Sequence, residues 1–119
     1  MTEPELLERW RLTWPSWFAD PAGAAPDPVV HIGPHSSRET NSSISAHMAA
    51  GTLVERLPTL RIPALFVHGD LDPLPTRSST ETAALIPGAR VEIIPRCGHF
   101  PWLERPGELR RLVADFVVG

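Results

Sequence analysis

An α/β fold is predicted by the second half of the chain, where two short apolar runs alternate with two segments of helical character. The apolar runs, 62–68 and 90–94, are typical of buried strands in parallel sheets. A strand–helix–strand–helix order favours parallel strands joined by a right-handed crossover. Residues 58–119 are therefore expected to form a βαβα unit.

The two helices of this unit have clear boundaries in the sequence. A helix is expected over 76–86, because the Pro-Gly pair that follows would stop it. Pro106 suits the first position of a final helix, after a loop at 95–105. The apolar face of that final helix is expected to consist of Leu109, Leu112, Val113 and Phe116.

Residues 1–57 are predicted to be a separate, helical segment. Thr2 and Glu5 have the spacing of a capping box, which marks the start of a first helix. Apolar side chains then recur at helical spacing until Pro15, which should kink or end the helix near Trp14.

The rest of this segment is expected to contain a loop and then more helix. The stretch 19–37 is rich in Pro, Gly and Ala, which is typical of a loop. The stretch 38–57 should form one helix or two short ones, ending at Pro58.

Composition narrows the class of protein. The chain has 119 residues, 42% hydrophobic and 21% charged, which fits a single globular domain rather than a disordered chain. A net charge of -3 without a basic run argues against nucleic acid as a partner, and no apolar run is long enough for a membrane span. A single cysteine, Cys97, favours a reducing, cytoplasmic location, and the use of Arg as the sole basic residue type suggests a bacterial source.

Two residues with acid–base chemistry each follow a predicted strand. Asp72 comes after the first strand and His99 after the second, so both should lie at the carboxyl edge of the sheet. A carboxylate beside an imidazole can fix its tautomer and stabilise its protonated form. Asp70 is an alternative carboxylate for this role, and either acid could instead cap the following helix.

Two motifs carry a resemblance to a known family. The stretch Val67-His68-Gly69-Asp70-Leu71-Asp72-Pro73-Leu74-Pro75 resembles the acid loop of the α/β-hydrolase superfamily. Cys97-Gly98-His99-Phe100-Pro101, followed by Glu104 and Pro106, resembles its terminal histidine loop. The resemblance covers 61–118 and implies the C-terminal part of an α/β-hydrolase parallel sheet, with Asp72 as the acid and His99 as the base of a catalytic triad.

The same resemblance implies a cap before the sheet. Residues 1–57 look like the later part of the helical cap of hydrolases related to proline iminopeptidases and epoxide hydrolases. Trp14, Trp17, Phe100 and Trp102 are candidates for a substrate pocket, with packing as the alternative. A small-molecule substrate without a cofactor or metal is implied.

The chain departs from the family pattern at the nucleophile. No Gly-x-Ser-x-Gly segment occurs, so the nucleophile, Ser or Asp, is expected to lie outside this chain. The predicted function is hydrolysis of an ester, amide or related bond, with only acid and base present here. The alternative is a non-catalytic truncated remnant, or a fragment that depends on a partner or on self-association through the unpaired edge of its first strand.

Other candidate residues have simpler interpretations. His68, just before Gly69, superficially resembles an oxyanion motif but is interpreted as the end of a strand. Cys97 is too close to His99 in the chain to serve as its nucleophile and is expected to be a packing residue. Five further polar residues of the N-terminal segment are expected to be exposed and not to form a metal site: His31, His35, His47, Glu39 and Glu55.

Overall fold

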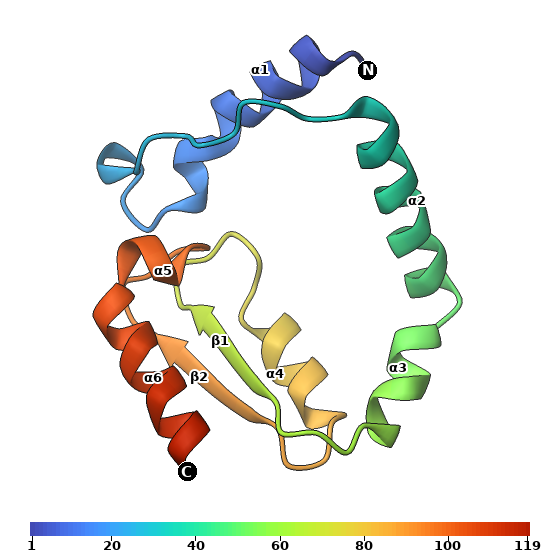
Figure 1. Ribbon diagram of the computed structural model, residues 1–119, viewed down its shortest axis with the longest axis vertical. Helices are drawn as coiled ribbons and strands as arrows, with labels where there is room; N and C mark the ends of the chain where they lie inside the picture. Colours follow the sequence, from blue (N-terminus) through green and yellow to red (C-terminus); the bar gives the residue numbers. More distant parts are fainter.

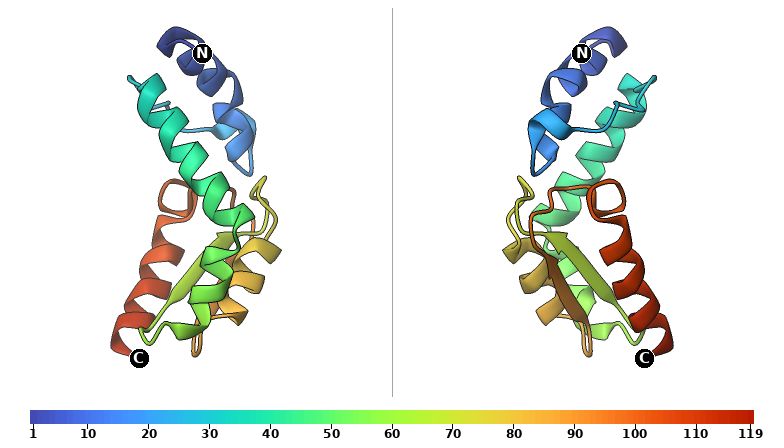
Figure 2. Two further views of the ribbon diagram at one scale, coloured as in Figure 1. Left: turned by 90° about the vertical axis from the view of Figure 1, so that its right-hand side faces the viewer. Right: turned by 90° about the vertical axis from the view of Figure 1, so that its left-hand side faces the viewer.

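The computed structural model describes residues 1–119 and contains the predicted βαβα unit (Figure 1). Strands β1 (Leu65–Gly69) and β2 (Arg90–Ile94) pair in parallel, with Leu65 opposite Arg90 and Gly69 opposite Ile94. Helices α4 (Arg77–Ala84) and α6 (Pro106–Val118) cover opposite faces of this two-stranded sheet (Figure 2). The predicted α/β class and parallel topology are confirmed.

The first strand is shorter than the sequence predicts. The ladder begins at Leu65 rather than at residue 62, because Pro63 has no N–H to donate. The last bond before the ladder runs from the Arg90 N–H to the Ala64 carbonyl, at 3.0 Å. The other edge of β1 has no partner strand.

The histidine loop contains a short helix that the sequence pattern did not predict. Helix α5 (Pro101–Glu104) lies directly before α6, and a proline occupies the first turn of each. A four-residue helix gives no periodic signal, which is why it was expected to be loop. Its effect is to turn the chain sharply between the site and α6 (Figure 1).

The N-terminal helix forms as expected. Helix α1 (Glu3–Thr13) begins at the capping box, where the N–H and the hydroxyl of Thr2 donate to Glu5 Oε2 at 2.6 and 2.9 Å. The α-helix gives way at Pro15 to a 3₁₀ turn over Trp14–Trp17. A second 3₁₀ turn (Pro21–Gly23) interrupts the following loop.

Two further helices connect this region to the sheet. Helix α2 (Pro34–Ala49) begins four residues earlier than predicted, because Pro34 opens it. Gly51, with a φ of 68°, separates it from α3 (Thr52–Arg56), so the two-helix alternative is the one that forms. A 3₁₀ turn (Leu57–Thr59) follows, and α2 and α3 together form an arc with no buried residue (Figure 1).

Buried side chains form two separate clusters. Ile94, Cys97 and Leu112 pack together between β2 and α6, with Val67 of β1 beside them. An aromatic cluster of Trp14, Phe18 and Phe100 joins the N-terminal segment to the histidine loop. Because the second cluster includes a residue beside His99, the N-terminal segment is anchored at the candidate site.

Candidate active site

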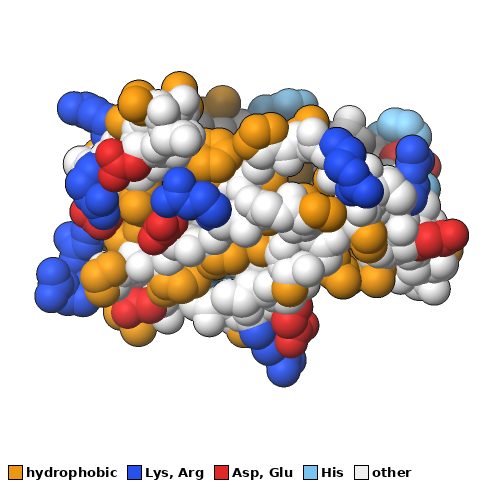
Figure 3. Space-filling view, turned by 90° about the horizontal axis from the view of Figure 1, so that it is seen from below, with side chains coloured by type: hydrophobic (Ala, Val, Ile, Leu, Met, Phe, Trp, Pro, Cys, Tyr) orange, Lys and Arg blue, Asp and Glu red, His pale blue; other side chains and the backbone are white.

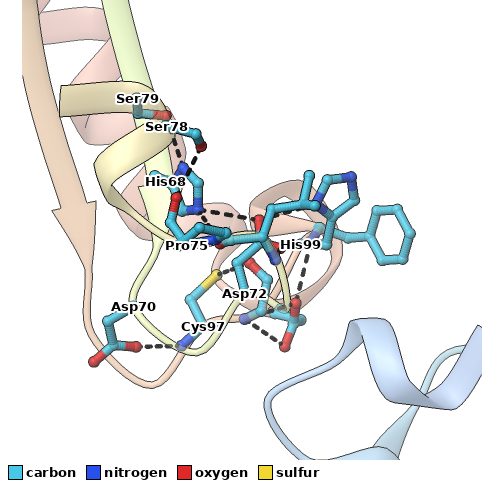
Figure 4. Close-up of polar contacts among 12 residues, drawn as sticks. His68, Asp70, Asp72, Pro75, Ser78, Ser79, Cys97 and His99 are labelled. Atoms are coloured by element: carbon cyan, nitrogen blue, oxygen red, sulfur yellow. Dashed lines mark hydrogen bonds and ion pairs between the residues drawn. The ribbon is translucent and has the colours of Figure 1, made fainter. Parts of the chain in front are cut away.

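The turn after β1 fixes Asp72. Its backbone N–H donates to the Gly69 carbonyl at 3.2 Å, and its Oδ1 accepts from the Leu74 N–H at 2.8 Å. The Asp72 side chain is only 7% exposed. The second carboxylate oxygen, Oδ2, is thereby held toward the loop that follows β2 (Figure 4).

His99 meets that oxygen. Its Nδ1 lies 2.9 Å from Asp72 Oδ2, and its backbone N–H donates to the Trp17 carbonyl at 2.7 Å (Figure 4). A carboxylate accepts hydrogen bonds, so the proton of the neutral imidazole belongs on Nδ1. The other ring nitrogen, Nε2, makes no hydrogen bond within the chain, and the side chain is 34% exposed. This arrangement leaves a lone pair that can accept a proton.

Asp70 has a different position from the one a triad acid needs. Its Oδ1 accepts from the Cys97 N–H at 3.3 Å, and its own N–H donates to the Ile94 carbonyl at 3.0 Å. These bonds join the two loops that carry Asp72 and His99. Asp70 therefore does not contact His99, and it does not cap α4. Both alternative roles suggested for it by the sequence are absent.

Cys97 is fully buried beneath the site. Burial, assisted by the nearby Glu104 carboxylate, raises the pKa of the Cys97 thiol to about 11. The thiol consequently keeps its proton at neutral pH, and its Sγ lies 3.6 Å from the Gly98 carbonyl. These features agree with a packing role.

His68 is the residue whose contribution the sequence did not reveal. Its Nε2 lies 2.8 Å from the Leu74 carbonyl and 3.4 Å from Asp72 Oδ2. A carbonyl can only accept, so Nε2 carries the proton, and Nδ1 can accept from the Ser79 hydroxyl at 2.7 Å. The acid thus has a buried histidine on one side and His99 on the other (Figure 4). The available signal was a polar residue ending an otherwise apolar strand.

Glu104 organises the histidine loop. Its carboxylate accepts from the N–H groups of Gly98 at 3.0 Å and Phe100 at 3.2 Å, on either side of His99. It also accepts from the Ala19 N–H at 2.8 Å, which ties the loop to the N-terminal segment. A carboxylate three residues into a short helix after a Gly-His pair is the signal that could have indicated this role.

The four aromatic candidates for a pocket divide into two pairs. Trp14 and Phe100 are 6% and 9% exposed and pack ring against ring, and the Trp14 Nε1–H donates to the Ala25 carbonyl at 2.7 Å. Neither lines the two cavities described below, and both pack as the alternative interpretation expected. Trp17 packs on His99 with ring centroids 4.8 Å apart, and Trp102 is exposed beside it.

One cavity contains the Asp72–His99 pair, and a second lies next to it. The first, of about 320 Å³, is lined by Asp72, His99 and Trp102 together with part of α4. The second, of about 720 Å³, extends from Pro73 and Trp17 to the space between α1 and α2. Trp102 therefore lines the cavity that includes His99, whereas Trp17 lines the neighbouring one.

The histidines outside the sheet region do not contact the Asp72–His99 pair. His31 pairs with Glu3, and His35 Nδ1 lies 3.1 Å from an Arg38 nitrogen. No three His, Cys, Asp or Glu side chains gather in a metal-binding geometry. None of the helices combines the length and apolar character needed to cross a bilayer.

Comparison with known proteins identifies the class. The model of the alpha/beta hydrolase family matches residues 2–112, and the chain belongs to that family. The superfamily resemblance inferred from the acid and histidine loops is thereby confirmed.

Individual relatives are hydrolases and a synthase. The chain is 38% identical over 63 residues to epoxide hydrolase A of Mycobacterium tuberculosis, covering 51% of this chain and 20% of that protein. It is 27% identical over 66 residues to a putative 2-succinyl-6-hydroxy-2,4-cyclohexadiene-1-carboxylate synthase of Bacillus subtilis, covering 56% and 24%.

Solved structures agree. Est816, described as an N-acyl homoserine lactone degrading enzyme, shares 36% identity at a TM-score of 0.51, over 53% of this chain and 25% of that one. A CIB-like hydrolase of Thermoplasma acidophilum shares 34% identity at a TM-score of 0.53, over 56% and 32%. The chain spans between a fifth and a third of the length of these relatives.

Proposed function

We propose that this chain supplies the acid and the base of an α/β hydrolase that cleaves an ester, lactone, amide or epoxide bond. The observation that carries the proposal is the 2.9 Å contact between Asp72 Oδ2 and His99 Nδ1, with Nε2 of His99 unbonded. An oriented imidazole with an open nitrogen is the arrangement a general base needs.

This geometry indicates which groups transfer the proton during the reaction. Nε2 of His99 takes the proton of an attacking hydroxyl as the nucleophile bonds to the substrate carbonyl, and the imidazolium then returns it to the leaving group. Water repeats the cycle and releases the acyl group. Asp72 stays ionised throughout and stabilises the imidazolium through Nδ1–H.

An Asp nucleophile would give His99 a different task. Carboxylate attack on an epoxide carbon forms an ester and breaks the C–O bond of the ring, and the ring oxygen leaves as an alkoxide that takes a proton from water. At an alkyl carbon the leaving group is a halide ion, which needs no proton. His99 then deprotonates the water that hydrolyses the ester. The 38% identity to epoxide hydrolase A supports this version, whereas the likeness to a lactone-degrading enzyme supports the Ser version. Both use the same acid and base.

The nucleophile comes, in this proposal, from outside residues 1–119. No hydroxyl or thiol is hydrogen-bonded to His99 Nε2, and the nearest serine pair is otherwise engaged: Ser79 with His68, and Ser78 with the Pro75 carbonyl at 2.8 Å. The unpaired edge of β1 is where a neighbouring strand of the full sheet would add. A strand there would be adjacent to Asp72.

His68 supports the acid in this scheme. The His68 Nε2–H donates to the Leu74 carbonyl and lies 3.4 Å from Asp72 Oδ2, which keeps the acid loop closed. The His68 side chain is 7% exposed, so water competes little for these contacts. We assign it a positioning role through Asp72. It does not touch the reacting atoms.

Residues 1–57 serve as the cap in this proposal. The aromatic cluster that includes Phe100 fixes the segment to the histidine loop, and Trp17 forms a wall beside His99. The buried, unpaired thiol of Cys97 supports a reducing compartment such as the bacterial cytoplasm.

A second candidate is a partner-dependent fragment without activity of its own. The specific observation in its favour is the exposed apolar surface along α6, which includes Val113, Val117 and Val118 and adjoins Trp102. Viewed from the end at which the C-terminus lies, adjoining hydrophobic side chains reach the surface between charged groups (Figure 3). A second copy or a partner chain would cover such a surface.

The test is expression of the reading frame that contains codons 1–119 with its upstream sequence, assayed on p-nitrophenyl acetate and on styrene oxide. We expect turnover, and a loss of about 10⁴-fold in kcat for His99→Ala and for Asp72→Asn. Turnover that survives both substitutions would contradict the assigned roles. The 119-residue chain alone should be inactive, and robust turnover by it would contradict the external nucleophile.

A further inference from the structure

The cavity of about 720 Å³ has an unusual lining for a space between two helices. On α1 the lining positions follow one helical face, as do those on α2. Facing helices normally present apolar stripes to each other. Here the facing positions on α2 include Ser37, Arg38 and Asn41, and α1 presents a mixed face of Leu6, Arg9, Trp10 and Thr13. A polar face opposite a mixed one across a gap is suited to an amphipathic ligand rather than to helix packing.

The charge in this cavity has one sign. Arg9 and Arg38 line it, and no Asp or Glu does. Arg38 is partly engaged, by Glu39 Oε1 at 3.2 Å and by the ring of His35. The Arg9 carbonyl accepts from the Thr13 hydroxyl at 3.1 Å, but its guanidinium makes no hydrogen bond or ion pair, so all five side-chain donors are available to an anion.

The opposite end of the cavity lies next to the candidate catalytic pair, although neither Asp72 nor His99 lines it. Pro73, the residue after Asp72, and Trp17, which packs on His99, both line it. The Trp17 Nε1–H is buried and has no hydrogen-bond partner. An occupant of this cavity would therefore lie against the indole that packs on His99 at one end and meet a guanidinium without a side-chain partner at the other.

The spacing along the chain sets the length of the occupant. Arg9 and Trp17 are eight residues apart on nearly continuous helix, which corresponds to roughly 12 Å. Trp10 lies between them on the same wall, and it offers an apolar surface. The cavity thus provides a cation and an apolar middle, and it ends at Trp17, the residue that packs on His99.

We propose that this cavity binds an elongated substrate that carries a carboxylate about 10 Å from the bond to be cleaved, with Arg9 as the principal carboxylate donor and Arg38 as the secondary one. The proposal rests on the function proposed above, because it places the reactive end of this substrate at His99. Its binding step, however, requires neither Asp72 nor the nucleophile.

The test uses octanoate as the probe and octanamide as its neutral isostere, titrated into the full chain and followed by the indole N–H resonances in NMR. We expect octanoate to bind about tenfold more tightly than octanamide, with a shift of the Trp17 resonance and none of Trp14, whose N–H is bonded to Ala25. Arg9→Gln should weaken octanoate binding about fivefold to tenfold, and Arg38→Gln less.

Arg11→Gln is the matched control, because Arg11 lies on the same helix and does not line the cavity. It should leave the affinity unchanged. Equal affinities for octanoate and octanamide, equal effects of Arg9→Gln and Arg11→Gln, or no saturable binding at millimolar octanoate would each overturn the proposal. Asp72→Asn should not alter binding, so a failure here leaves the proposed catalytic pair standing and separately testable.

Discussion

Residues 1–57 and residues 58–119 differ sharply in how many buried side chains stabilise them. Of the 12 buried residues, ten lie in 58–119 and two, Trp14 and Phe18, lie in 1–57. Both of these pack on Phe100 of the C-terminal region. The comparison teaches that the βαβα unit fixes the geometry of Asp72 and His99, whereas the N-terminal region contributes a wall and the space in front of it.

The largest expected effect comes from adding a single methyl group inside the βαβα unit. A Cβ at Gly69 would lie less than 3.0 Å from the backbone of Cys97 and Gly98. Because backbone atoms cannot move aside, we expect Gly69→Ala to destabilise the chain by about 4 kcal/mol or more. Urea denaturation followed by circular dichroism measures this change.

Gly107→Ala is the control for that substitution, because a Cβ there meets nothing within 4 Å. It should be neutral or slightly stabilising in a helix. Equal stabilities of the two variants would show that the approach of the two loops is looser than the structure indicates.

The next prediction compares the loss of stability caused by truncating a core residue with that caused by truncating a residue of the arc formed by α2 and α3. Leu112 is 7% exposed in the cluster with Ile94 and Cys97, so Leu112→Ala should cost about 3 kcal/mol. Met48 of α2 is 69% exposed, and Met48→Ala should change the free energy of unfolding by less than about 0.5 kcal/mol. A comparable loss at both positions would indicate that the arc is covered in solution.

High pH should lower the stability of the fold by ionising the buried thiol of Cys97. Burial raises the pKa of Cys97 from its usual 9.0 to about 11, so the unfolded chain releases the thiol proton first. The stability is therefore fully present below pH 9.0 and is lost as the pH rises through 11, by about 2 to 3 kcal/mol in total.

This pH range isolates Cys97, because the chain contains neither Lys nor Tyr. Thermal unfolding followed at intervals from pH 8 to pH 11 measures the loss. Cys97→Ala should remove the dependence over that range. A wild-type profile as flat as that of the variant would contradict the buried state of the thiol.

The smallest expected effect concerns the link between the two regions. Glu104→Ala removes the acceptor for Gly98, Phe100 and Ala19, and we expect a loss of about 1 to 2 kcal/mol. Glu108→Ala is the control, since Glu108 makes only an exposed pair with Arg111 and should contribute less than about 0.5 kcal/mol. If both variants have the same stability, the Ala19 link does not hold the regions together.

The sequence predicted those features that depend on neighbours in the chain. Pro and Gly mark the ends of strands and helices, and the acid and histidine loops have local patterns that place Asp72 and His99 at one sheet edge. Two contacts that complete the site were not predicted. Glu104 reaches Ala19 across 85 residues, a spacing that a single sequence does not reveal. His68 and Asp72 are close in the chain, but the apolar pattern assigns His68 to the end of a strand, and the two side chains meet because the acid loop folds back.

Contacts with distant residues also explain why Trp14 and Trp17 have different surroundings. Trp14 and Trp17 have equivalent helical spacing in the sequence, yet one is buried against Phe100 and the other faces His99. Periodicity alone assigns the two side chains to one stripe, whereas the partners that distinguish them, Phe100 and His99, lie in the distant histidine loop.

The central claim is that Asp72 holds His99 with its proton on Nδ1 and its Nε2 free to act as a base. Long-range ¹H–¹⁵N NMR of the imidazole rings in the 119-residue chain, above the pH at which His99 becomes cationic, reports this directly. We predict the Nδ1–H form for His99 in the wild type and a shift toward the Nε2–H form in Asp72→Asn. A wild-type His99 that carries its proton on Nε2, or a tautomer ratio that Asp72→Asn leaves unchanged, would contradict the account.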